Sequence, residues 1–101
     1  MEFTEPLNNG FTVYTKSGCP NCMKVKKILK EKNILFITVD CDNYLIEEKD
    51  NFLSFIKLKS NSEHKTFPII FHDGIFVGGY QETVQFLDKL LSFGFSENEV
   101  F

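Results

Sequence analysis

Residues 11–22 read Phe-Thr-Val-Tyr-Thr-Lys-Ser-Gly-Cys-Pro-Asn-Cys, and the expected fold is built around this segment. Residues 11–14 are apolar, aromatic or β-branched, which predicts a short strand. Gly18 and Pro20 mark the loop that follows, and Pro20 suits the first turn of a helix, where its missing N–H costs nothing. The stretch therefore predicts a strand that passes into a helix, with a Cys-x-x-Cys motif (Cys19 and Cys22) at the junction.

From Pro20 onward the apolar residues recur at helical spacing, up to Asn33, where we expect the helix to end. One face carries Cys22, Val25, Ile28 and Leu29. The opposite face carries Lys24, Lys26, Lys27 and Lys30. A lysine series of this kind is usually a solvated helix surface, although beside an active site it can steer acidic partners.

The next two predicted elements are a buried strand over residues 34–39, which form an almost continuous apolar run, and a second helix. Asp42 or Asn43 can cap that helix, which we expect to reach about Leu58. Its inward-facing residues are expected to be Leu45, Phe52, Phe55 and Ile56.

The remaining elements are a hairpin and a final helix. Residues 67–71 predict a third strand, and Asp73-Gly74 predicts a tight turn into a fourth strand at residues 75–77. The last helix is expected from about Gln81 to Leu91, and the segment from Ser92 onward is expected to be a loose tail.

The resulting order, β-α-β-α-β-β-α, predicts an α/β fold with a four-stranded mixed sheet flanked by helices on both faces. We expect one domain over residues 1–101, with a short N-terminal lead-in. The Cys-x-x-Cys motif then lies at the carboxyl end of the first strand, where open α/β sheets bind their ligands.

Composition narrows the choice of partners and compartment. The net charge is −3 and all eleven basic residues are lysines, so nothing suggests a nucleic-acid partner. No apolar stretch is long enough to span a membrane, and the acidic N-terminus does not resemble a signal peptide. We therefore expect a cytoplasmic monomer in a reducing compartment, where a Cys-x-x-Cys is more often catalytic or metal-binding than structural.

The motif itself predicts thiol–disulfide chemistry. Cys19 precedes the helix, so unpaired N–H groups and the positive end of the helix dipole point at its sulfur and favour the thiolate. Lys16, three residues earlier, can bring an ammonium close, and the N–H of Cys22 can donate to the sulfur. Cys22 lies one turn further, on the inward face. We expect Cys19 to attack a disulfide and Cys22 to resolve the mixed disulfide.

Two other uses of a Cys-x-x-Cys motif remain open. A zinc site needs two more ligands, and the soft candidates Cys41, His64 and His72 form no recognisable second pair. A purely structural disulfide is uncommon in a reducing compartment. We expect no bound metal or cofactor, with Cys41 packed as a small apolar residue and His72 as a polar residue at the hairpin.

Four segments together resemble the glutaredoxin family, in order and across residues 10–91. Residues 13–22 resemble its strand, lysine and dithiol, and Thr-Phe-Pro at residues 66–68 resembles its Thr-Val-Pro segment, whose proline is cis. Residues 71–74 match its hairpin, and Gly-Gly followed by Tyr-Gln-Glu at residues 78–82 resembles the turn that opens its last helix.

The resemblance implies a thioredoxin-like fold and glutathione as co-substrate, with glutathionylated proteins and protein disulfides as partners. Phe67 would offer its backbone to the cysteinyl part of glutathione. The N–H groups of Gln81 and Glu82 would receive the γ-glutamyl carboxylate, as helix N-termini receive anions. The glutathione-binding residues that the resemblance implies are Lys16, Lys65, Thr66, Phe67, Pro68, Gly79, Gln81 and Glu82.

The chain departs from the family pattern at three positions. Asn21 replaces the usual aromatic residue between the cysteines, and Glu82 stands where an aspartate is usual. The family carries a polar residue in its second helix, and the nearest counterpart in this chain is Phe55. Two alternative functions stay open: a thioredoxin-like electron donor reduced by a flavoprotein reductase, and a non-catalytic module that holds an iron–sulfur cluster.

Overall fold

The computed structural model describes residues 2–99 and centres on a four-stranded mixed sheet. Its strands are β1 (Phe11–Thr15), β2 (Phe36–Asp40), β3 (Ile69–His72) and β4 (Ile75–Gly78), in the order β2-β1-β3-β4. β1 pairs in parallel with β2 and antiparallel with β3, and β3 pairs antiparallel with β4. The predicted mixed sheet is confirmed.

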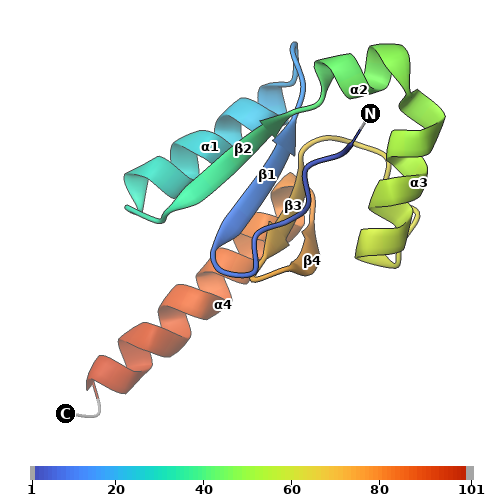
Figure 1. Cartoon of the computed structure of the whole chain (residues 1–101). Coiled ribbons are helices and arrows are strands. Elements are labelled where there is room, and N and C mark those ends of the chain that lie inside the picture. The colour runs from blue at the N-terminus through green and yellow to red at the C-terminus, as the bar shows by residue number, and fades with distance from the viewer. Residues whose placement is uncertain (1, 100–101) are drawn as a thin grey trace.

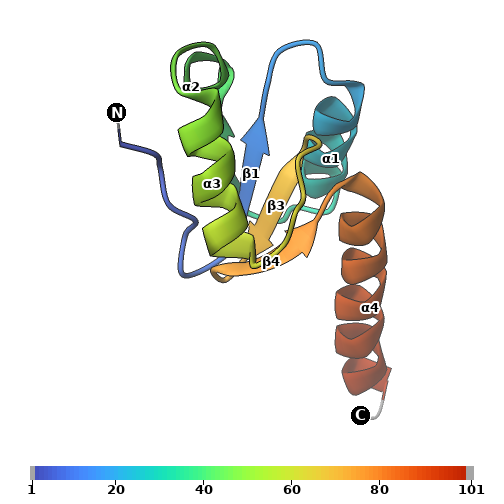
Figure 2. The ribbon, with the colours of Figure 1, turned by 90° about the vertical axis from the view of Figure 1, so that its right-hand side faces the viewer.

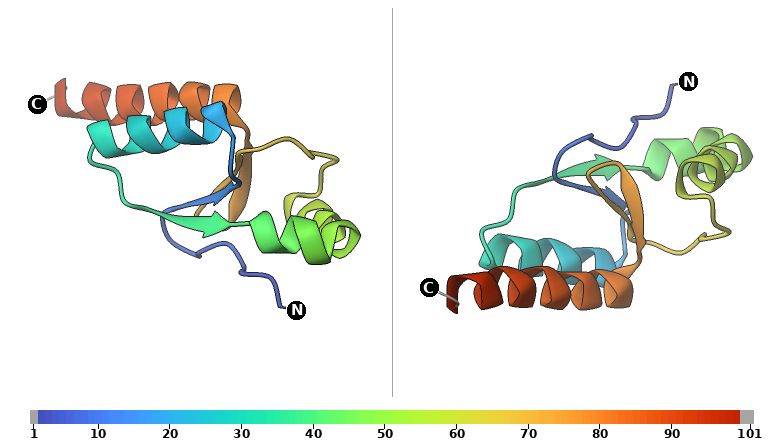
Figure 3. Two further views of the ribbon diagram at one scale, coloured as in Figure 1. Left: turned by 90° about the horizontal axis from the view of Figure 1, so that it is seen from above. Right: turned by 90° about the horizontal axis from the view of Figure 1, so that it is seen from below.

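Helices cover both faces of the sheet. α1 (Pro20–Glu31) and α4 (Tyr80–Glu99) run side by side on one face, and α2 (Asp42–Glu47) and α3 (Lys49–Ser60) cover the other (Figure 1, Figure 2, Figure 3). Because β1 lies in the middle of the sheet, all five of its residues are buried. Among the residues described, no helix combines the length and apolar character needed to cross a bilayer.

Two apolar clusters fill the space between the sheet and the two helical layers. On the α2 and α3 side the fully buried members include Tyr14, Phe52, Ile56 and Phe71. On the α1 and α4 side they include Phe11, Val13, Val25, Leu29, Ile70 and Leu87. Each fully buried side chain of this kind contributes roughly 1.5–3 kcal/mol relative to an exposed one. Because the second cluster contains residues of both β1 and α1, it fixes the position of the loop that joins these two elements.

The predicted second helix is wrong in one respect, because the structure has two helices there. Glu48, with φ −144° and ψ 49°, leaves helical geometry between α2 and α3. The predicted inward-facing residues are nevertheless correct, since they all pack in the cluster on this side of the sheet: Leu45, Phe52, Phe55 and Ile56. The break does not disturb the helical spacing of these apolar residues, because three of the four lie in α3.

The final helix is longer than expected. It was predicted to end at Leu91 but continues to Glu99. How loosely the segment from Ser92 onward is held stays a prediction, and its last two residues, 100–101, lie outside the part of the chain that the structure describes.

The N-terminal lead-in is packed along the α2 and α3 side. The ring of Phe3 contacts those of Tyr44, Phe52 and Phe55, with centroids 4.9, 5.4 and 5.3 Å away. The buried Tyr14 hydroxyl donates to the Thr4 carbonyl over 2.6 Å. This segment therefore belongs to the same apolar cluster as α3.

Candidate active site

The two cysteines of the motif lie where β1 gives way to α1, as predicted. Cys19 is the N-cap of α1 and Pro20 follows in its first turn, while Cys22 lies one turn into the helix. The structure holds a Cys19–Cys22 disulfide with 5.2 Å between the Cα atoms. The N–H of Cys22 donates to Cys19 Sγ over 3.1 Å. Cys19 keeps 8% of its surface exposed and Cys22 only 1%, so Cys19 is the more accessible of the two cysteines.

The helix start around Cys19 is electrostatically open to a negative charge. The first turn of α1 contains no acidic side chain that would compete for the positive end of the dipole. The Lys16 ammonium lies 5.5 Å from the centroid of the Phe67 ring, at the side of the cavity that Cys19 also lines. A thiolate at Cys19 would therefore face N–H groups and a nearby cation.

A carboxylate that the sequence interpretation missed anchors the loop before Cys19. Asp42 accepts two hydrogen bonds from Ser17: one from its N–H over 2.9 Å and a second, short one from its hydroxyl. The bond from the Ser17 hydroxyl lowers the pKa of Asp42 most, and the bond from the Ser17 N–H and the charge of Lys16 lower it further. Asp42 was predicted as a possible helix cap, but its side chain spans to the active-site loop instead.

The loop before β3 brings a second set of predicted residues beside Cys19. The Phe67–Pro68 peptide is cis, as the resemblance implied. A cavity of about 380 Å³ opens between this loop and the start of α1. Five of the predicted site residues line it: Lys16, Cys19, Lys65, Thr66 and Phe67. Asn21 also lines this cavity and is exposed, so its amide takes the place of an aromatic wall.

The turn that opens α4 is shaped by Glu82. Its carboxylate accepts the Gly79 N–H over 2.8 Å, in the manner of a helix-capping glutamate. Gly78 has φ +133°, and a Cβ there would lie 2.7 Å from the Glu82 Cβ. The first intrahelical bond runs from the Thr83 N–H to the Gly79 carbonyl over 3.0 Å, so the N–H groups of residues 80–82 have no acceptor within the helix.

The predicted residues thus fall into two neighbouring groups. Gly79, Gln81 and Glu82 do not line the Cys19 cavity; they lie at the start of α4. The two helix starts are adjacent, because the Lys24 ammonium lies 5.6 Å from the centroid of the Tyr80 ring. Pro68, which follows Phe67 in the same loop, is buried.

The other cysteine and the histidines lie away from the dithiol cavity. Cys41 is fully buried, and this burial raises the pKa of its thiol to about 12. It packs as the small apolar residue that was predicted. His72 lies at the hairpin, 3.7 Å from the Asp73 carboxylate. Among the side chains of residues 2–91 no three of the types that bind metals come together.

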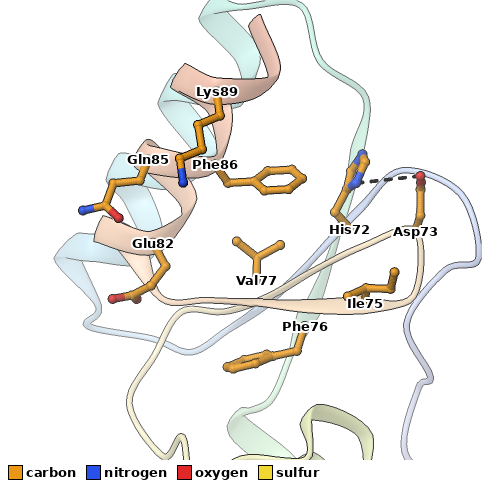
Figure 4. Close-up of a pocket in the computed structure, with 9 residues that line it drawn as sticks. All are labelled: His72, Asp73, Ile75, Phe76, Val77, Glu82, Gln85, Phe86 and Lys89. Atoms are coloured by element: carbon orange, nitrogen blue, oxygen red, sulfur yellow. Dashed lines mark ion pairs between the residues drawn. The ribbon is translucent and has the colours of Figure 1, made fainter. Parts of the chain in front are cut away.

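A separate cavity of about 430 Å³ lies between the β3–β4 hairpin and α4 (Figure 4). Val77 and Phe86 point into it from opposite sides, and Lys89 and Gln85 border it along α4. Neither cysteine lines this cavity, and Glu82 is its only residue among those predicted for glutathione. Thiol chemistry therefore belongs to the α1 end of the sheet.

Comparison with known proteins agrees with this geometry. Residues 11–77 match the glutaredoxin family model. Glutaredoxin 1 of Rickettsia felis is 38% identical over 84 residues, which cover 78% of each chain. The crystal structure of glutaredoxin 1 from Francisella tularensis complexed with cacodylate has a TM-score of 0.71 at 31% identity, covering 81% of this chain and 95% of that one.

A buckwheat glutaredoxin–glutathione complex shares the fold, with a TM-score of 0.63 at 22% identity, covering 76% of this chain and 66% of that one. The family match includes both cysteines of the motif and the loop that carries the cis proline. Glutaredoxins are thiol–disulfide oxidoreductases, and by family match, relatives and fold this chain belongs to the glutaredoxin family.

Proposed function

We propose that this chain is a glutathione-dependent thiol–disulfide oxidoreductase of the cytoplasm, active as a monomer on disulfides and glutathione-mixed disulfides. The observation that carries the proposal is the cavity beside Cys19, which combines this cysteine at a helix start with Lys16, Lys65, Thr66 and Phe67. A cavity lined by a reactive sulfur, two lysine ammonium groups and the loop at residues 66–67 suits a small peptide thiol with carboxylates at its ends.

Cys19 acts as the nucleophile in this proposal. Its greater exposure and its position at the helix start both favour it over Cys22. The Cys22 N–H, 3.1 Å from Cys19 Sγ in the disulfide, would donate to a thiolate at the same place after reduction. Lys16 adds a positive charge at the cavity wall.

Glutathione would lie with its cysteinyl part along Phe67 and its glycyl carboxylate near Lys16 and Lys65. Its γ-glutamyl end would extend towards the start of α4. There the N–H groups of Gln81 and Glu82 lack intrahelical acceptors and suit a carboxylate. The Glu82 carboxylate, which accepts a hydrogen bond from the Gly79 N–H, would be the partner of the γ-glutamyl ammonium.

The reaction on a glutathione-mixed disulfide takes two exchanges. The Cys19 thiolate attacks the glutathione sulfur, the disulfide bond of the substrate breaks, and the substrate thiol leaves as a thiolate that takes up a proton. A second glutathione thiolate then attacks the glutathione sulfur bound to Cys19. Glutathione disulfide leaves and the Cys19 thiolate is restored.

Protein disulfides require Cys22 as well. Cys19 attacks one sulfur of the target, and the Cys22 thiolate then attacks Cys19 Sγ, which releases the reduced target. The product is the Cys19–Cys22 disulfide that the structure holds. Two glutathione molecules would return it to the dithiol and leave as glutathione disulfide.

A coupled assay tests the proposal. Glutathione, glutathione reductase and a glutathionylated peptide are mixed with the protein, and consumption of NADPH reports turnover. We expect Cys19→Ser to abolish activity, and Cys22→Ser to keep deglutathionylation but lose reduction of a peptide with an internal disulfide.

Two results would count against the proposal. Full activity of Cys19→Ser would remove Cys19 as the nucleophile. Turnover by the wild-type protein with a flavoprotein reductase, and none with glutathione, would point to a thioredoxin-like donor instead. Cys41→Ala serves as the matched control, because Cys41 lies in the core and should not affect turnover.

A further inference from the structure

A second cavity, of about 470 Å³, lies on another side of the dithiol, between α1 and the end of β2. Both Cys19 and Cys22 line it, whereas the cavity with Phe67 touches Cys19 alone. β2 is an edge strand, so nothing in the sheet continues beyond this side (Figure 1). The glutathione proposal uses the Phe67 cavity and leaves this one unassigned.

The charge beside this cavity opposes that of the rest of the chain. Residues 20–32 contain five lysines and one glutamate, a net charge of +4, while the other six lysines and thirteen acidic residues give −7. Among the side chains of residues 2–91 no lysine of α1 forms an ion pair with a carboxylate. Lys26 lines the cavity itself, and Asp40 is the only acidic residue there.

An apolar side chain completes the surface. Met23 also lines the cavity and keeps 68% of its surface exposed, although it lies one residue after the buried Cys22. Methionine is flexible and polarizable, so it can adapt to different partner side chains. Apolar contact and positive charge therefore meet beside both sulfurs.

We propose that this cavity and the adjacent lysines of α1 dock the disulfide-bearing segment of an acidic protein substrate. The proposal rests on the thiol–disulfide exchange described above and names its protein partner by chemistry: a segment with carboxylates near the reacting cysteine and an apolar residue that packs on Met23. Attraction between such a segment and α1 would speed encounter and raise kcat/KM.

The exchange that follows docking balances without another reagent. The Cys19 thiolate forms a bond to one target sulfur, and the other target sulfur leaves as a thiolate. Cys22 then forms its bond to Cys19 and frees the first target sulfur, so two electrons pass from the dithiol to the target.

Three cyclic disulfide peptides that differ only in two flanking residues, Glu, Gln or Lys, test this docking. The readout is the ratio of kcat/KM between the Glu and Lys peptides for the wild-type protein and two variants. Lys26→Glu/Lys27→Glu reverses charge on α1, and Lys49→Glu at the start of α3 is the control on the other face of the sheet. The ratio cancels any general effect of a substitution on Cys19, since both peptides experience it.

We expect the wild type to prefer the Glu peptide by about three- to tenfold at low salt, as for one or two exposed charge pairs. Lys26→Glu/Lys27→Glu should abolish or invert that ratio, and Lys49→Glu should keep it. The wild-type ratio should shrink as salt rises from about 20 to about 300 mM.

Equal kcat/KM for the three wild-type peptides, or one ratio shared by both variants and the wild type, would overturn the docking proposal. Inhibition by a short oligonucleotide but not by a non-reactive acidic peptide would show that the lysines bind phosphates instead. Failure of the wild type to reduce any of the peptides, or a small neutral disulfide, would instead overturn the thiol chemistry on which docking rests.

Discussion

The Cys22 N–H donates to Cys19 Sγ across 3.1 Å, and under the proposed mechanism this contact links the resolving cysteine to the sulfur that it would attack. Since Cys19 is a helix N-cap, the same geometry that starts α1 also stabilises negative charge on its sulfur. The asymmetry between the cysteines is therefore built into the helix start.

That asymmetry predicts the order in which the cysteines react. In the reduced protein at pH 7, iodoacetamide should label Cys19 at least about tenfold faster than Cys22 or Cys41, because Cys19 is the most accessible of the three cysteines and faces the helix dipole. Peptide mapping by mass spectrometry after brief labelling measures the order. Equal labelling of Cys19 and Cys22 would contradict the assigned roles.

Burial of Cys41 predicts a loss of stability in alkali. Its thiol has a pKa of about 12 in the folded chain against 9.0 ordinarily, so only the unfolded chain releases this proton between those values. The free energy of unfolding should then fall as pH rises above 9, by up to about 1.4 kcal/mol per pH unit.

Urea titrations between about pH 8 and pH 10 measure this slope, because the Cys41 thiol of the unfolded chain begins to ionise in that range. Substituting serine for both Cys19 and Cys22 in the proteins compared prevents thiol exchange. Adding Cys41→Ala should lower stability overall but remove the Cys41 part of the slope. Identical slopes with and without Cys41 would show that its thiol ionises as readily folded as unfolded.

The bond pair between Ser17 and Asp42 predicts an effect at acid pH. The folded-state pKa of Asp42 is lowered, first by the Ser17 hydroxyl and then by the Ser17 N–H, so the stabilisation is present above the ordinary value of 3.8 and lost as pH falls below it. Asp42→Asn should therefore be less stable than the wild type at neutral pH, and the gap should narrow in acid.

Asp88→Asn, at an exposed position on α4, removes the same charge and is the matched control. Urea midpoints across the acid range measure both variants. A gap for Asp42→Asn that stayed constant down through the acid range would mean that the Ser17 bonds do not depend on the carboxylate charge.

Close packing of Gly78 against Glu82 predicts a costly substitution. A Cβ at Gly78 would meet the Glu82 Cβ at 2.7 Å, and that atom is fixed by the helix and cannot rotate away. Gly10→Ala shares the left-handed backbone, with φ +89°, but meets nothing closer than 3.9 Å. Gly78→Ala should thus lose about 1–3 kcal/mol more stability than Gly10→Ala. Equal losses in chemical denaturation would contradict this packing.

Much of this fold is predictable from local pattern. The strand, loop and helix over residues 11–31 follow from β-branched residues, Gly18, Pro20 and the spacing of apolar residues. The hairpin turn follows from Asp73 and Gly74, whose φ values of 53° and 80° suit a two-residue turn. The resemblance to glutaredoxins also predicted that the loop with Phe67 belongs to the site, and Phe67 does line the same cavity as Cys19.

Features that depend on contacts between distant segments were not predictable. Nothing in the local sequence marks the break at Glu48, and the Asp42–Ser17 bonds join residues 25 positions apart. The cavity between α1 and β2 likewise exists only once β2 pairs beside β1. A polar residue shortly after a strand, such as Asp42 two residues beyond the end of β2, is the one sequence signal that points to this end of the sheet.

The most direct test of the central claim is a mass measurement. Reduced Cys22→Ser is incubated with glutathione disulfide, and the adduct is located by peptide mapping. The account predicts one glutathionyl group per chain, attached to Cys19 and removed by added glutathione. No adduct, or an adduct on Cys41 with Cys19 unmodified, would contradict it.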